Sequence, residues 1–253
     1  MRPFSITTFF IVLFSVSNSK AQDNHPLVTD RPDMTESSVS VAPGFFQIET
    51  GFHFENEQTD GTNTYYRNLN TSLLRYGLLD GLEFRFGFGY SSFSAPGSTL
   101  TGFEPSSFGF KFELFEQSGM LPETAFLNTF VPGFSGSREF RPAQWESEFL
   151  GAMAWGIEEF DLGVNLGVAF GEADGALFPY SWALGVPVLN NLDGFVELFG
   201  SFSENGGSSH SGNIGLTWLL NPDFQLDAYY GLGFNDRAVD WSAGIGLSWR
   251  FEI

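Results

Sequence analysis

Long stretches of this chain alternate with a period of two residues, and this pattern constrains the fold more than any other feature of the sequence. Between Phe160 and Phe170 every second residue is large and apolar, and the residues between them are Asp, Gly, Asn, Gly and Ala. The stretches 82–90 and 241–251 repeat the pattern, with their charged residues on the small-residue face. Such alternation predicts β-strands with one apolar face.

The small-residue face distinguishes the chain from a soluble β-sandwich, whose outward face carries Lys, Glu and Thr rather than Gly, Ser and Ala. The 253 residues include 31 Phe, 30 Gly and only two Lys, unlike a typical globular protein. After residue 21, no stretch approaches the eighteen uninterrupted apolar residues that would indicate a membrane-spanning helix. We therefore predict an all-β fold, a single antiparallel transmembrane β-barrel of the Gram-negative outer membrane, which satisfies every backbone group in lipid.

The first residues predict export. Arg2 precedes an apolar run from Phe4 to Val16, and Ser19-Lys20-Ala21 follows as a cleavage pattern, so residues 1–21 are expected to be a signal peptide. The alternative is an N-terminal anchor, but the run has about thirteen residues where a membrane helix needs roughly twenty. Cleavage leaves nine basic and thirty acidic side chains, a net charge of about −21. This excess of acid argues against a nucleic-acid partner.

Cofactor and metal sites are not indicated by the sequence. The chain has no cysteine and no paired histidines, and its glycines recur at period two instead of forming a phosphate-binding loop. We therefore predict no cofactor and no metal. The expected partners are the outer-membrane lipid and a small-molecule solute.

We predict twelve strands in the barrel, which should occupy residues 44–253. Their ranges are 44–55, 65–76, 82–92, 106–115, 122–133, 144–156, 160–171, 177–189, 194–204, 211–220, 224–234 and 240–252. The connections alternate between a short set, assigned to the periplasm, and a generally longer set that includes 93–105, assigned to the outside. An even number of strands then places both termini in the periplasm. Two strands fit poorly, because Arg67 and Arg75 interrupt 65–76 and no face of 122–133 can be assigned.

The tryptophans provide a geometric check, since tryptophan favours the membrane interface. Trp145 and Trp155 lie ten residues apart on one predicted strand, which at ~3.3 Å per residue and a tilt near 40° corresponds to roughly 25 Å across the membrane. A soluble core would not predict that spacing. The predicted aromatic girdle consists of Trp145, Trp155, Trp182, Trp218, Trp241 and Trp249.

Charged residues on the inward parity are predicted to line the lumen. They are Glu49, Glu55, Glu83, Arg85, Lys111, Glu113, Glu146, Glu148, Asp161, Glu197, Asp227 and Arg250. Their balance is acidic, which favours cations. Alternatively, opposed charges such as Glu83 and Arg85 only pair with neighbours and fill the interior. Twelve strands enclose a narrow lumen, so we predict a channel for small solutes rather than a general porin.

A polar leader, residues 22–43, precedes the barrel and is too short to be a domain. We predict that Asp30, Arg31 and Asp33 line the lumen, with the Arg31 guanidinium bound to the inward carboxylates Glu49 and Glu83. The leader would then act as a lumenal constriction or plug. The alternative is a disordered leader.

Two parts of the sequence resemble a known family. The runs LVTDRPDMTES (27–37) and PGFFQIETGF (43–52) look like the start of the bacterial outer-membrane, transporter-like family named for a putative MetA (meta) pathway of phenol degradation. The turn RYGL (75–78) followed by LEFR (82–85) is similar to that family too. The resemblance implies a barrel with a transport role. It assigns no function to a residue, because the substrates of the family are largely unestablished.

Two other functions fit a barrel of this size. An outer-membrane lipid hydrolase needs a His within hydrogen-bond reach of a Ser. The three histidines, His25, His53 and His210, do not meet this requirement in the predicted arrangement, so we predict that the protein is not an enzyme. The other alternative is a non-conducting structural or adhesive barrel, whose long loop 93–105 binds a partner or folds inward.

Overall fold

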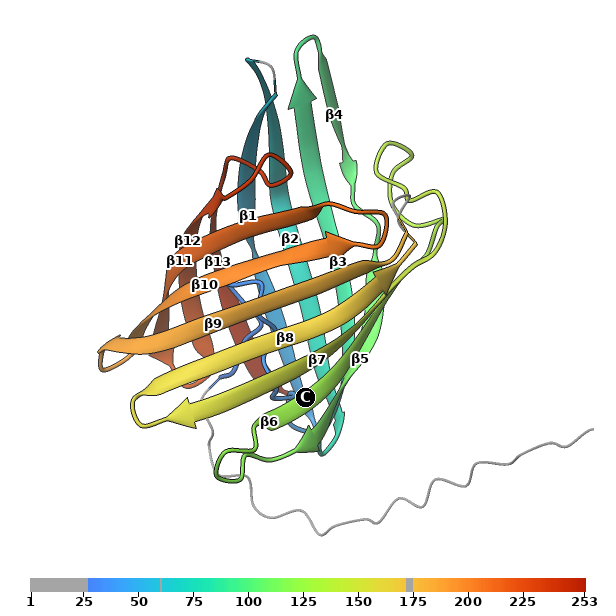
Figure 1. Ribbon diagram of the computed structural model, residues 1–253. Helices are drawn as coiled ribbons and strands as arrows, with labels where there is room; N and C mark the ends of the chain where they lie inside the picture. The colour runs from blue at the N-terminus through green and yellow to red at the C-terminus, as the bar shows by residue number, and fades with distance from the viewer. Residues whose placement is uncertain (1–26, 60, 172–174) are drawn as a thin grey trace, which may run out of the picture.

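The computed structural model describes residues 27–59, 61–171 and 175–253, and every regular element in them is a β-strand (Figure 1). The strands are β1 (Phe45–Thr59), β2 (Thr62–Leu79), β3 (Leu82–Ala95), β4 (Ser98–Phe103), β5 (Ser107–Phe115), β6 (Glu123–Val131), β7 (Glu146–Ile157), β8 (Phe160–Phe170), β9 (Leu177–Leu189), β10 (Leu192–Ser203), β11 (Ser208–Asn221), β12 (Phe224–Gly233) and β13 (Trp241–Glu252). Within the described residues there is no helix of the length and apolarity that a membrane crossing requires.

The sheet closes on itself because β1 pairs with both β2 and β13. The β1–β13 ladder runs from Phe45 opposite Glu252 to Asn56 opposite Trp241. Strand β3 pairs with β5 through its first half and with β4 through its second half, so β4 and β5 share one position in the wall. All of these pairings are antiparallel. The fold is therefore a closed antiparallel barrel of twelve strands, as predicted.

The prediction of a loop over 93–105 was wrong, because most of this stretch forms a hairpin. Strand β3 continues to Ala95, and β4 returns along it after a turn at Gly97, whose φ of 79° suits glycine. Strands β1 to β4 extend past the rest of the wall (Figure 1). Thr99, Leu100 and Thr101 are exposed there. Because this part of the sheet stands beyond the barrel wall, it lacks the alternation of large and small residues by which the other strands were found.

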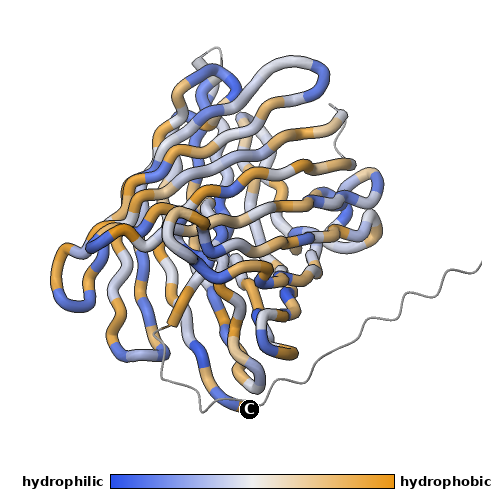
Figure 2. The backbone as a smooth tube through the Cα atoms, turned by 60° about the horizontal axis from the view of Figure 1, so that its bottom comes forward, coloured by the Kyte–Doolittle hydropathy of each residue, from blue (hydrophilic) through white to orange (hydrophobic). Residues whose placement is uncertain are grey.

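The barrel is polar inside and apolar outside. Among the described residues, the largest fully buried side chains are Arg75, Lys111, Gln47, Glu49 and Glu83. Leu166, Ile214 and Ile245, by contrast, are more than half exposed on the outer surface. Figure 2 shows apolar and polar residues alternating along the strands. This inverted arrangement is the one that a barrel wall facing lipid requires.

The six tryptophans of the predicted girdle differ in exposure. Trp145, Trp182, Trp218 and Trp249 are exposed, whereas Trp155 and Trp241 are half-buried. Trp145 lies one residue before β7 instead of within it, and it packs against Phe134. The position of the girdle relative to a membrane stays a prediction.

Both described ends of the chain lie at the end of the barrel with the short turns. The Leu27 N–H donates to the carbonyl of Pro222 between β11 and β12 (3.0 Å), and the Ile253 N–H donates to the carbonyl of Gly44 (2.9 Å). The chain enters β1 beside Gly77, where a Cβ would lie 2.0 Å from the carbonyl oxygen of Ala42. Position 77 therefore admits only glycine. The assignment of this end to the periplasm stays a prediction.

Candidate functional site

Residues 27–43, which we call the lumenal segment, lie inside the barrel and bond to its wall on several sides (blue in Figure 1). The Asp30 N–H donates to Glu49 on β1 (3.1 Å), and the Met34 N–H donates to Glu197 on β10 (2.9 Å). The Glu36 N–H donates to the side chain of Asn165 on β8 (2.6 Å), whose amide returns a bond to the Glu36 carbonyl (3.0 Å). The segment therefore crosses the lumen from wall to wall.

Three cations from adjacent wall positions surround the carboxylate of Asp30. They are Arg75 on β2, Arg85 on β3 and Lys111 on β5, and we call them the cationic belt. The distances from Asp30 oxygens are 3.0 Å to Arg75 Nη1, 2.5 Å to Arg85 Nη1 and 2.9 Å to Lys111 Nζ. The side chains of the belt are at most 7% exposed. One carboxylate thus holds together three buried cations.

Two wall carboxylates share the belt with Asp30. Arg75 binds Glu49 (2.8 Å) and Glu83 (2.9 Å), and Arg85 binds Glu83 (3.1 Å). Glu83 and Arg85 therefore pair with each other, which is the alternative that the sequence left open. Three wall cations face two wall carboxylates here. The lumenal segment adds the negative charge of Asp30, and its Glu36 also binds Arg85, at 2.7 and 2.9 Å.

Strands β10 and β12 also receive donors from the lumenal segment. Arg31 forms a two-point ion pair with Asp227 on β12, at 3.0 and 3.2 Å. The hydroxyl of Thr35 donates to Glu197 on β10 (2.7 Å). The prediction that Arg31 binds Glu49 or Glu83 was wrong, because Arg75, already fixed in the wall, takes both carboxylates.

Glycines make room for the Arg31 guanidinium. A Cβ at Gly246 on β13 would lie 2.2 Å from Arg31 Nη2, and a Cβ at Gly51 on β1 would lie 2.5 Å from it. We expect Gly246→Ala to push the guanidinium away from Asp227 and to lower the free energy of unfolding by about 1–3 kcal/mol. Urea unfolding in lipid vesicles measures this loss.

The matched control for this prediction is Gly185→Ala on β9, where the nearest atom to an added Cβ is 3.7 Å away. Its free energy of unfolding should stay within about 0.5 kcal/mol of the wild type. Equal stabilities of the two variants would show that the Arg31 contact contributes nothing.

Three carboxyl groups of the lumenal segment have shifted pKa values. Burial raises the pKa of Asp30, but the belt cations outweigh burial and hold this pKa well below its usual range. Burial, followed by the charge of Glu197, raises the pKa of Asp33 well above its usual range. Burial also raises the pKa of Glu36 to about 7, although Arg85 opposes the shift. Asp30 is therefore the firmly ionised carboxylate of the segment.

A lumenal cavity of about 340 Å³ lies beside the segment. Met34 and Glu36 of the segment form one side, and Glu148, Asn165 and Ser201 are among the wall residues that line it. This space is mixed in character, with polar and apolar groups.

The remaining predicted lumenal residues lie away from the belt. Glu113 is exposed and accepts bonds from the backbone N–H and the hydroxyl of Ser40 (2.5 and 2.7 Å). Arg250 pairs with Asp223 (2.7 Å) near the C-terminus. Glu146 and Asp161 stand at strand ends, at the start of β7 and of β8.

Sequence reasoning missed Arg75, Glu36 and Asn165. Arg75 had been read as an interruption of its strand, yet it is fully buried and contacts Asp30, Glu49 and Glu83. Asn165 stood on the inward parity of its strand, and that position was the available signal. Nothing in the sequence distinguishes Glu36 from its polar neighbours.

Both histidines in the described residues have partners other than serine. His53 contacts the Tyr229 hydroxyl and Glu55 (2.7 Å to Glu55), and His210 contacts the Tyr180 hydroxyl (2.7 Å). His25 lies outside the described residues. Over the same described ranges, no three His, Cys, Asp or Glu side chains are grouped to hold a metal ion.

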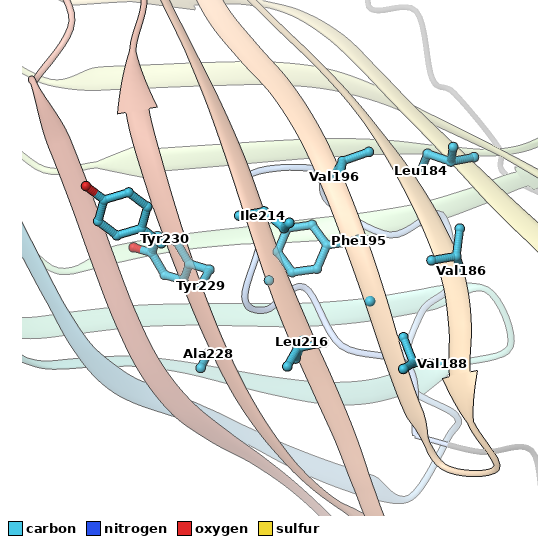
Figure 3. A pocket seen from close by; sticks show the side chains of 12 residues that line it. Leu184, Val186, Val188, Phe195, Val196, Ile214, Leu216, Ala228, Tyr229 and Tyr230 are labelled. Carbon is cyan, nitrogen blue, oxygen red and sulfur yellow. The ribbon is translucent and has the colours of Figure 1, made fainter.

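A second hollow, of about 580 Å³, lies on the outer face of β9 to β12 (Figure 3). Val188, Val196, Ile214 and Leu216 line it, and all four are at least 44% exposed. Val196 precedes Glu197 on β10 and therefore faces away from the lumen, and Ile214 is its partner on β11. The hollow therefore belongs to the apolar outer surface and not to the lumenal site.

Comparison with known proteins agrees with this architecture. An outer membrane channel from Pseudomonas putida F1 is similar, with a TM-score of 0.69 and 10% identity, over 88% of this chain and 100% of that chain. The KdgM porin in complex with disordered oligogalacturonate has a TM-score of 0.57 and 8% identity, over 81% and 99% of the two chains. The translocator domain of the autotransporter NalP from Neisseria meningitidis has a TM-score of 0.55 and 14% identity, over 83% and 90%. These likenesses show the fold of an outer-membrane β-barrel.

No curated protein sequence matches the chain. One family model does, and it matches residues 29–251, which include most of the lumenal segment and nearly the whole barrel. The chain therefore belongs to the family described as "Putative MetA-pathway of phenol degradation".

Proposed function

We propose that this outer-membrane barrel is a narrow channel for small solutes and that the lumenal segment restricts its lumen. The observation that carries the proposal is the wall-to-wall course of the segment, which bonds to β1, β8, β10 and β12. A cavity of about 340 Å³ remains beside it. That volume is near the lower end of the ~300–1,000 Å³ typical of small-molecule sites.

The charge along the rest of the path supports a preference among solutes. Glu148 lines the lumenal cavity, and Glu113, Glu146 and Asp161 stand near the ends of their strands. We propose that these carboxylates make the approaches to the belt acidic. Such approaches favour solutes that carry a positive group.

A reversible lock on the segment tests the proposal. The hydroxyl oxygens of Thr35 and Ser181 on β9 lie 2.9 Å apart, and the chain has no cysteine of its own. Thr35→Cys combined with Ser181→Cys is therefore expected to form a disulfide that ties the segment to the wall. Proteoliposomes with the oxidised variant should swell more slowly in small sugars than those with the wild type, and a reducing agent should restore the rate.

The matched control is Ser94→Cys combined with Thr99→Cys, whose hydroxyl oxygens lie 3.3 Å apart in the β3–β4 hairpin. Oxidation of this pair should leave the swelling rate unchanged. Impermeable vesicles in every state would contradict a channel and favour a structural or adhesive barrel. Equal permeability of the oxidised and reduced lock would contradict the role of the segment.

A further inference from the structure

The cationic belt has the composition of a binding site for one carboxylate. Its three cations converge on the two oxygens of Asp30 from three neighbouring positions in the wall. Two of the cations are guanidinium groups, whose planar donor forks match carboxylate oxygens. The third, Lys111, donates to both Asp30 oxygens, at 2.9 and 3.1 Å. The group that fills this site belongs to the chain itself.

The charge of the belt fits a monoanion. The three cations are balanced only in part by Glu49 and Glu83, so the wall alone carries one positive charge more than it has negative charge at this level. A buried cation without a partner is strongly unfavourable. The segment also binds Arg85 through Glu36 (2.7 Å). If the segment withdraws, Asp30 and Glu36 leave together, and a single negative charge restores the balance of the wall, whereas a dianion would exceed it.

The wall carboxylates outside the belt show what the rest of the ligand should carry. Asp227 on β12 and Glu197 on β10 accept hydrogen bonds from the guanidinium of Arg31 and the hydroxyl of Thr35. Both acceptors are carboxylates with buried side chains. A group that binds there must therefore donate hydrogen bonds or carry positive charge.

We infer that the cationic belt binds the carboxylate of a permeating solute, and that the Asp30 carboxylate occupies the same site while the lumenal segment lies in the lumen. The inference rests on the proposed channel function. The solute class is a small monocarboxylate with an ammonium, guanidinium or hydroxyl group at its other end. The solute competes with Asp30 for the belt, and Asp227 and Glu197 receive its donors.

Chemical rescue of Asp30→Ala tests the site in the full mature chain. The substitution removes the carboxylate and leaves space for a small free one. We expect a lower urea midpoint of unfolding than in the wild type, and we expect acetate to recover most of the loss. Acetamide, which has the same shape without the charge, and chloride, which has the charge without the shape, should recover little at equal concentration and ionic strength.

Two further variants keep this test decisive. Asp30→Ser retains an acceptor for Lys111 and is run in parallel in case the alanine variant does not fold. Asp33→Ala is the control, because this carboxyl belongs to the same segment but lies near Glu197, and its midpoint should not respond to acetate. Acetate acting no better than acetamide on both Asp30 variants would overturn the site, and chloride acting as well as acetate would overturn its preference for carboxylates. The rescue measures stability, so it can fail or succeed independently of the swelling experiment.

Discussion

Deleting residues 27–40 is expected to raise single-channel conductance several-fold in planar lipid bilayers. The deleted stretch provides the groups that span the lumen, including Asp30, Arg31 and Thr35. Without them, the narrowest part of the path is bounded by wall side chains alone. The current should also become steadier, because no tethered segment remains to enter and leave the lumen.

The deletion removes both a length of chain and the side chains that bond to the wall. Replacing residues 27–40 by Gly and Ser of the same length separates these two effects. It keeps a tether of equal length but removes every side chain that bonds to the wall. Its conductance should approach that of the deletion. Conductance equal to that of the wild type in both variants, with barrels that migrate as folded on gels, would show that the segment does not restrict the lumen.

The second large effect is expected from Arg75→Met. This guanidinium is fully buried and binds Asp30, Glu49 and Glu83. Its loss leaves three buried carboxylates short of a cation, and breaking a buried ion pair in this way costs about 3–5 kcal/mol of the free energy of unfolding. Urea unfolding in vesicles measures the change.

Arg67→Met is the matched control for Arg75→Met, because Arg67 lies on the same strand, is exposed, and contacts the ring of Tyr65. We expect a change within about 0.5 kcal/mol. The triple variant of Arg75→Met with Glu49→Gln and Glu83→Gln should recover part of the stability that Arg75→Met alone loses. A loss as small as that of Arg67→Met would mean that solvent enters the belt and that its charges are not desolvated.

The barrel was predictable because lipid enforces a simple rule on each strand. A strand such as β8 must direct its large apolar residues outward and its small or polar residues inward, so the period-two pattern marks it. The rule acts only where the strand faces lipid. The β3–β4 hairpin reaches past the wall, so its sequence lacks the pattern and its residues were assigned to a loop.

The candidate site was predicted less completely, for a reason visible in β2. The pairing of β2 with β3 shifts register between Asn68 and Asn70, and β1 and β2 shift between Gly51 and His53. A bulge reverses which side of the strand an odd-numbered residue faces. Arg75 therefore appeared to break the pattern, although it faces the lumen. A pattern of fixed period cannot contain such a shift, and only the strand pairing reveals it.

Partner choice within the lumen was beyond the sequence for another reason. The predicted bond from Arg31 to Glu49 or Glu83 was chemically reasonable, and each of these side chains does lie inside the barrel. The choice between acceptors depends on which cations the closed wall places beside each carboxylate. That information is distributed over strands that are distant in sequence, since Arg31 and Asp227 are 196 residues apart.

The bonds that the segment makes across the barrel also have a mechanical consequence. A twelve-stranded ring without internal ties can flatten into an ellipse at little cost, because each ladder bends slightly. Because the lumenal segment bonds to strands on several sides of the barrel, it resists changes in the distances between these strands. Release of the segment therefore softens the whole ring, so that the shape of the passage, as well as its width, depends on these few residues.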